Sequence, residues 1–111
     1  PNPFLVFWAR YDIEQGAYAV LIFKTPESDE VVRRYETGSA DWFQEAIDLT
    51  PFSGGSFSIL FIGKDIASVE YCAAYIASVD GGIRCVRLQK SPGAAVEWAI
   101  QDIRIVPDYK P

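Results

Sequence analysis

Histidine is absent from this chain of 111 residues, and cysteine occurs only twice. Without histidine, the usual serine–histidine–aspartate triad of hydrolases is excluded, and a zinc site loses its most frequent nitrogen ligand. Cys72 and Cys85 lack the Cys-x-x-Cys spacing of zinc sites. Isolated thiols of this kind usually pack as small apolar side chains, and a disulfide between them is the open alternative. We therefore expect a cytoplasmic or other intracellular, reducing compartment.

Basic side chains are also scarce, because ten lysines and arginines stand against fifteen aspartates and glutamates. The imbalance lies in the first half, where residues 1–55 carry four basic and nine acidic side chains. Domains that bind nucleic acids normally carry a basic surface that neutralises phosphates. The net charge of −5 therefore argues against nucleic acid as a partner of this domain alone.

Long hydrophobic runs and low-complexity tracts are missing as well. The longest apolar run, residues 17–23, is much shorter than the roughly 20 residues that cross a bilayer, so no membrane association is expected. The chain is nevertheless 50% hydrophobic and 14% aromatic, which is enough for one core. We expect a single soluble domain over residues 1–111. Because the chain begins with Pro1, we also expect a trimmed protein or a fragment, from which a removed leader would leave no trace.

Five segments have the β-branched and aromatic content of strands. The first two are apolar on both faces and are joined by a short polar stretch, which predicts a hairpin inside a covered sheet. The third is polar on much of both faces and suits an edge strand. In chain order, the expected strands are residues 3–11, 17–23, 30–36, 56–63 and 83–88.

Three other segments show helical periodicity, with apolar side chains three and four residues apart. Ser39 and Asp65 are expected to cap the first two helices, and Ser91 followed by Pro92 has the pattern of a third helix start. The expected helices are residues 39–49, 65–79 and 91–104. The element order is then β-β-β-α-β-α-β-α. This order predicts an α/β domain in which three antiparallel strands precede two strand–helix units, with helices on the faces of a mixed five-stranded sheet.

Three acidic residues fall at significant places in this order. Asp12 follows the first strand, Asp65 follows the fourth, and Glu97 lies in the helix after the fifth, within SPGAAVEWAIQDIR. The order and these positions resemble the ribonuclease H-like superfamily, in particular the integrase and transposase catalytic cores. The stretch YETGSADWFQEA is also similar to the start of that family's first helix. The resemblance implies that the three acids form a triad that binds two magnesium ions for phosphodiester chemistry.

Each acid of this triad also has a purely structural interpretation. Asp12 stands where a turn begins, Asp65 is the natural N-cap of its helix, and Glu97 fits the solvent-facing side of a surface helix. In these roles the three residues need no cofactor. Magnesium is expected only if the triad is formed.

Two functions follow from these alternatives. The first is a non-catalytic protein-interaction or assembly module that binds a protein partner or forms a dimer. The second is a magnesium-dependent nuclease or strand-transfer core. The acidic charge favours the first function. The expected contact residues are Arg33 and Arg34, on the edge strand, and Trp98, which lies about 100° from the centre of its helix's apolar stripe and is expected to be partly exposed.

Overall fold

The computed structural model describes residues 2–52, 54–64, 70–78, 82–89 and 96–110. Within these ranges the chain forms eight strands, and its only helical element is a single 3₁₀ turn, η1 (Thr50–Phe52). The strands, in chain order, are β1 (Phe4–Ile13), β2 (Tyr18–Lys24), β3 (Asp29–Tyr35), β4 (Gly38–Asp48), β5 (Ser56–Lys64), β6 (Glu70–Ser78), β7 (Gly82–Gln89) and β8 (Val96–Val106).

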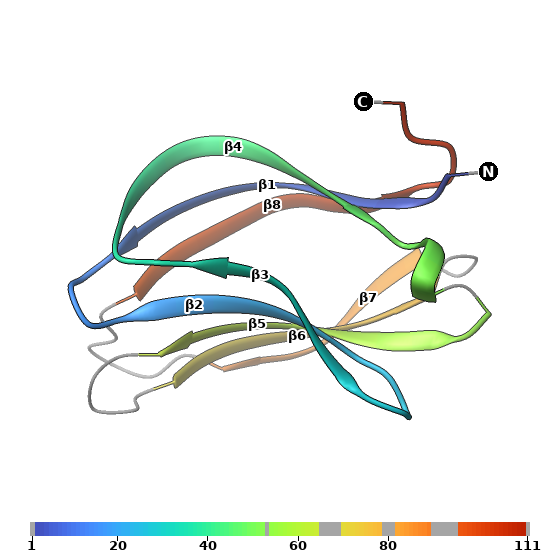
Figure 1. Cartoon of the computed structure of the whole chain (residues 1–111), viewed down its shortest axis with the longest axis horizontal. Coiled ribbons are helices and arrows are strands. Elements are labelled where there is room, and N and C mark those ends of the chain that lie inside the picture. Colours follow the sequence, from blue (N-terminus) through green and yellow to red (C-terminus); the bar gives the residue numbers. More distant parts are fainter. Residues whose placement is uncertain (1, 53, 65–69, 79–81, 90–95, 111) are drawn as a thin grey trace.

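The strands make two antiparallel sheets that stack as the two layers of a sandwich (Figure 1). The small sheet has the order β4-β1-β8, and the large sheet has the order β3-β2-β5-β6-β7. The chain passes between the sheets after β1, β3, β4 and β7. Each sheet has one apolar face, and stacking the two sheets buries both of these faces together.

The core lies between the sheets and is built from alternate residues of the facing strands. Phe7 of β1 and Phe61 of β5 meet edge to face across the gap, with their ring centroids 5.6 Å apart. Trp98 of β8 packs against Phe61 and Tyr35 at centroid distances of 5.1 Å. The largest fully buried side chains are Phe7, Phe23, Phe61, Leu5, Leu21, Leu49, Ile59 and Val6.

This fold overturns the expected α/β class and, with it, the resemblance to the ribonuclease H-like superfamily. The segments expected to be helices contribute strands: 39–49 contains most of β4, 65–79 contains β6, and 91–104 contains most of β8. Residues 65–69, 79 and 91–95 of these segments lie outside the described residues. All five expected strands are present, and the third is an edge strand as predicted. The expected hairpin is wrong, because β1 and β2 belong to different sheets.

Two β-bulges explain why β4 and β8 have a helical pattern of apolar residues. In β8 the register slips between Val6 and Trp8 of β1, so that one extra residue of β8 enters the pairing. The slip places the inward-facing Ile100 and Ile103 three residues apart, as in a helix, although the backbone is extended. A second slip between Ala9 and Tyr11 does the same to β4. The period of two that identifies a strand is therefore interrupted in both segments.

The two cysteines lie on neighbouring strands but are not opposite each other. Cys72 of β6 pairs with Gln89, whereas Cys85 of β7 pairs with Tyr75. The described segments include no helix with the length and apolar character needed to cross a membrane.

Candidate functional site

The outward side of the small sheet carries two tryptophans that remain partly exposed. In β1, Trp8, Arg10 and Asp12 point outward in alternation with core residues. Trp8 and its neighbour Trp42 of β4 each keep 38% of their surface exposed. Of the described large apolar residues, only Val31, at the edge of the other sheet, is also exposed. The two exposed indoles lie on neighbouring strands of the same sheet, and tryptophan is enriched at contact sites between proteins.

The two bulges lie on either side of Trp8 and shape this surface. On β4, Asp41 and Trp42 together stand opposite Arg10 of β1. The Trp42 amide donates a hydrogen bond to Oδ1 of Asp41 at 2.8 Å. The bulge on β8 contains Asp102. Its φ of 52° lies in the left-handed region, which residues other than glycine rarely adopt. Bulges of this kind bend strands and re-aim side chains, and they are frequent beside functional sites.

Polar groups surround the two tryptophans. The guanidinium of Arg10 lies over the ring of Trp42, 5.6 Å from its centroid, which is a cation–π contact. The exposed amides Gln44 and Gln101 stand opposite Trp8 on its two neighbouring strands. We call this surface the aromatic face. It consists of Trp8, Arg10, Asp12, Trp42, Gln44, Glu97 and Gln101.

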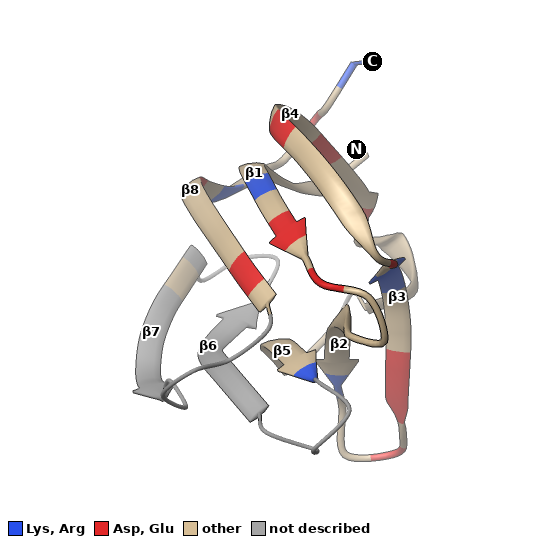
Figure 2. Ribbon diagram, turned by 90° about the vertical axis from the view of Figure 1, so that its left-hand side faces the viewer, with Lys and Arg blue, Asp and Glu red and all other residues tan. Residues whose placement is uncertain are grey.

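One end of the aromatic face is acidic, where Asp12 and Glu97 are direct partners in the register of β1 and β8. Both side chains are exposed. Figure 2 shows the acidic segments of these two strands on the same end of the small sheet. Among the described residues neither carboxylate has an ion-pair partner. Two like charges directly opposite each other on adjacent strands repel and destabilise the sheet.

The structure thus brings two members of the predicted triad together, although by strand pairing and not in the expected fold. Asp65, the third member, lies outside the described residues. In the part of the chain that is described, no group of three or more histidine, cysteine, aspartate and glutamate residues could hold a metal. Two exposed carboxylates supply too few ligands for a pair of magnesium ions. Asp12 and Glu97 alone do not fit the magnesium centre that the resemblance implied, so no metal chemistry is derived from them.

The predicted contact residue Trp98 is not at the surface. Its side chain is only 5% exposed and forms part of the core, so the expectation of partial exposure is wrong. That expectation assumed a helix, in which residue 98 would lie beside the apolar stripe. In the strand that forms instead, residues 96, 98 and 100 all point inward.

Arg34, another predicted contact residue, is exposed, and its guanidinium contacts two neighbours. It forms an ion pair with Glu36 and lies over the ring of Tyr18, 4.0 Å from the centroid. These contacts hold Arg34 on the outward side of the large sheet, away from the aromatic face.

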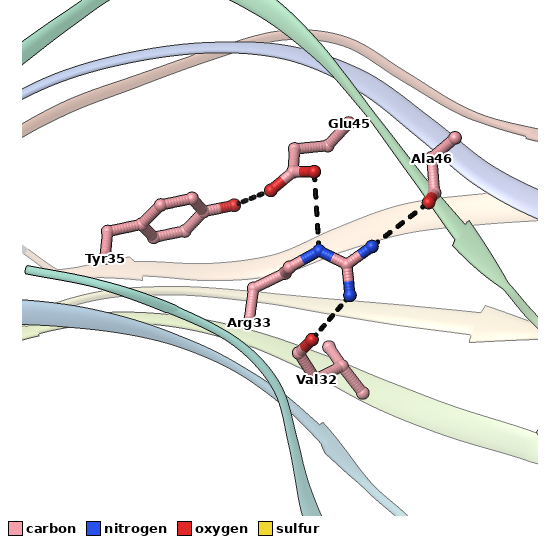
Figure 3. Close-up of polar contacts among 5 residues, drawn as sticks. All are labelled: Val32, Arg33, Tyr35, Glu45 and Ala46. Atoms are coloured by element: carbon pink, nitrogen blue, oxygen red, sulfur yellow. Dashed lines mark hydrogen bonds and ion pairs between the residues drawn. The ribbon is translucent and has the colours of Figure 1, made fainter.

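Arg33 points inward and links the two sheets, as Figure 3 shows. Its Nε donates to Oε1 of Glu45 at 3.4 Å, and its terminal nitrogens donate to the carbonyl oxygens of Val32 at 2.7 Å and Ala46 at 3.2 Å. The other carboxylate oxygen of Glu45 accepts a hydrogen bond from the Tyr35 hydroxyl. Burial raises the pKa of Tyr35 above its usual value, and the bond to Glu45 raises that pKa further. These contacts hold Arg33 within the fold.

The sequence contained a signal for the aromatic face that the strand prediction did not use. Trp8, Arg10 and Asp12 recur at every second position, which is the period of one face of a strand. The surrounding segment is so apolar that both faces were interpreted as covered. Trp42 falls within residues 39–49, which were predicted to form a helix and which mostly form the bulged strand β4 instead.

Comparisons with models of known protein families, with curated proteins and with solved structures find no match to this chain. Its function is therefore inferred from the chemistry of its surface.

Proposed function

We propose that this chain is a non-catalytic protein-interaction module whose contact surface is the aromatic face. The observation that carries the proposal is the pair of partly exposed tryptophans, Trp8 and Trp42, with Arg10 stacked on the second ring. Tryptophan and arginine are the side chains that most often dominate the binding energy of protein interfaces.

The arrangement of the face supports this role. Protein interfaces have an apolar centre and a polar rim that excludes water from the centre. Here the indole rings form the centre, and Gln44, Gln101 and the acidic pair lie around it. Catalytic sites usually enclose their substrate in a cleft, whereas both tryptophans stand on the outer side of a sheet. A broad partner surface fits this geometry better than a small substrate.

Site-specific photo-crosslinking tests the proposal. A photoreactive amino acid is introduced at Gln44 or Gln101, beside Trp8, and at Ser58 of β5 on the large sheet as the matched control position. We expect the first two positions to crosslink one protein partner that Ser58 does not reach. A crosslink to a second copy of this chain would identify self-association through the same face.

Binding of the captured partner must also depend on the two tryptophans. Trp8→Ala and Trp42→Ala are each expected to weaken its binding at least tenfold, roughly 1.4 kcal/mol, because they remove anchor side chains. Val31→Ala removes an exposed apolar side chain from the other sheet and should leave the affinity unchanged. Equal capture from Ser58, or unchanged binding by both tryptophan variants, would refute the proposed function.

A further inference from the structure

We infer that the partner of the aromatic face offers an apolar side chain flanked by lysine or arginine. This inference rests on the proposed function and adds the chemistry of the partner. Its basis is the uneven distribution of charge around Trp8 and Trp42.

The charge at one end of the face is negative. Asp12 and Glu97 are both exposed there, and Arg10, the cation of the face, is already placed over the Trp42 ring. The chain as a whole carries a net charge of −5. Complementary charge on a partner speeds its approach and fixes its orientation. A basic surface is therefore the best complement to this end.

The pairing of Asp12 with Glu97 indicates where a cation would be placed. Side chains directly opposite each other in an antiparallel pair have Cβ atoms roughly 5 Å apart. A guanidinium or ammonium group can contact both carboxylates across that distance. In the free protein the two carboxylates repel each other, whereas in the complex both would be paired with one cation of the partner. The two adjacent carboxylates therefore lower the stability of the free protein and strengthen the complex.

A second copy of the chain fits this surface less well than a basic partner. A two-fold dimer brings the same surface of each subunit together, so the acidic ends of both copies would contribute to one interface. The net charge of −5 on each chain adds a longer-range repulsion. A different protein with a basic surface would avoid both the contact between acidic ends and the repulsion between two negatively charged chains.

Selection of displayed random peptides on the folded chain provides the test. Peptides are selected on the wild-type protein and counter-selected on the double variant Trp8→Ala/Trp42→Ala, so that only binders of the aromatic face remain. We expect lysine or arginine to be enriched beside an aromatic or aliphatic residue. We also expect the affinity of a selected peptide to fall as salt rises from about 0.05 M to about 0.5 M, because salt screens charge pairs.

A neutralised variant separates the charge effect from the apolar contact. Asp12→Asn should raise the melting temperature by about 1–4 °C, because it removes the repulsion. It should weaken binding of the selected peptide about threefold to tenfold. Glu27→Gln makes the same charge change in the β2–β3 turn of the large sheet and should leave the peptide affinity unchanged.

The outcomes distinguish this inference from the proposed function. Selected peptides that are acidic or uncharged, or that bind Asp12→Asn as tightly as wild type, would overturn the basic partner while leaving the aromatic face as the contact surface. Failure to recover any peptide that distinguishes wild type from the tryptophan variant would overturn both. A wild-type protein that associates with itself through this face would also overturn the basic partner.

Discussion

The guanidinium of Arg33 donates a hydrogen bond to the carbonyl oxygen of Ala46 at 3.2 Å, and this bond joins the edge strands of the two sheets. A second donor of the same guanidinium binds the carbonyl oxygen of Val32 in β3. Unpaired carbonyl groups at a sheet edge can accept a further strand from another molecule. Arg33 occupies two carbonyl groups of these edge strands and hinders such pairing there.

Replacing Arg33 with methionine tests this role. Arg33→Met keeps an apolar stem but removes the donors to Val32, Glu45 and Ala46. We expect the free energy of unfolding to fall by about 1–3 kcal/mol, because partly buried acceptors lose their hydrogen bonds. We also expect association that increases with concentration, measured by sedimentation velocity. Arg34→Met is the matched control and should cost less than about 1 kcal/mol, because that guanidinium is exposed. Equal losses in the two variants would contradict the role of Arg33.

The raised pKa of Tyr35 predicts how the stability of the fold changes at alkaline pH. Its pKa is raised in the folded protein, mainly by burial and then by the bond to Glu45. Its stabilising effect is therefore complete below the unfolded pKa of about 10 and is lost as the pH rises above that value. Denaturant unfolding above and below about pH 10 should show this loss in the wild type and a smaller loss in Tyr35→Phe.

The same variant should also be less stable at neutral pH. Tyr35→Phe removes a hydrogen bond to a carboxylate, and we expect it to cost about 1–2 kcal/mol. Tyr109→Phe is the control, because its hydroxyl has no hydrogen bond recorded with the described residues. A Tyr35→Phe protein as stable as the control would show that the bond to Glu45 contributes nothing.

Asp48 should titrate at lower pH than an ordinary aspartate. Its carboxylate accepts a hydrogen bond from the backbone amide of Thr50 at 2.9 Å, and this bond, followed by one from the Thr50 side chain, lowers the pKa of Asp48. The associated stability is present above the unfolded pKa of about 3.9 and is lost as the pH falls through the folded value. Thr50→Val should raise the pKa of Asp48 only part of the way, because the backbone bond remains. NMR titration measures both values, and an unchanged pKa in Thr50→Val would exclude the side-chain bond.

The bulge at Asp102 reverses the usual ranking of residues in a strand. Valine normally favours strands and glycine weakens them. Because the φ of Asp102 is 52°, Asp102→Val should cost about 1–2 kcal/mol, whereas Asp102→Gly should be nearly neutral. Chemical denaturation of the two variants measures the difference. A valine variant more stable than the glycine variant would mean that β8 is regular at this point.

The strands that were predicted correctly share a simple feature. Residues 17–23 and 56–63 have many β-branched and aromatic side chains, and β2 and β5 follow them almost without interruption. The failures have physical causes. The bulges in β4 and β8 give their apolar residues the spacing of a helix. The alanines of β6 favour a helix by propensity, but pairing with β5 and β7 makes this segment a strand.

The residues of the proposed contact surface followed from the sequence only in part. Asp12 and Glu97 were expected to lie close together only if the magnesium triad formed, and they face each other instead on paired strands of an all-β sandwich. Trp98 was chosen as a contact residue because a helix would expose it, and the strand buries it. Trp8 and Trp42 come together only through the pairing of β1 with β4, a contact between segments more than thirty positions apart that local patterns do not specify.

The decisive measurement is the affinity of the crosslinked partner for Trp8→Ala, Trp42→Ala and Val31→Ala, determined by calorimetry on proteins first shown to be folded by thermal melting. If the aromatic face is the contact surface, each tryptophan variant loses at least about tenfold in affinity, and Val31→Ala binds as the wild type does. If the tryptophan variants bind like the wild type, or if Val31→Ala loses as much as they do, the contact surface lies elsewhere on the sandwich.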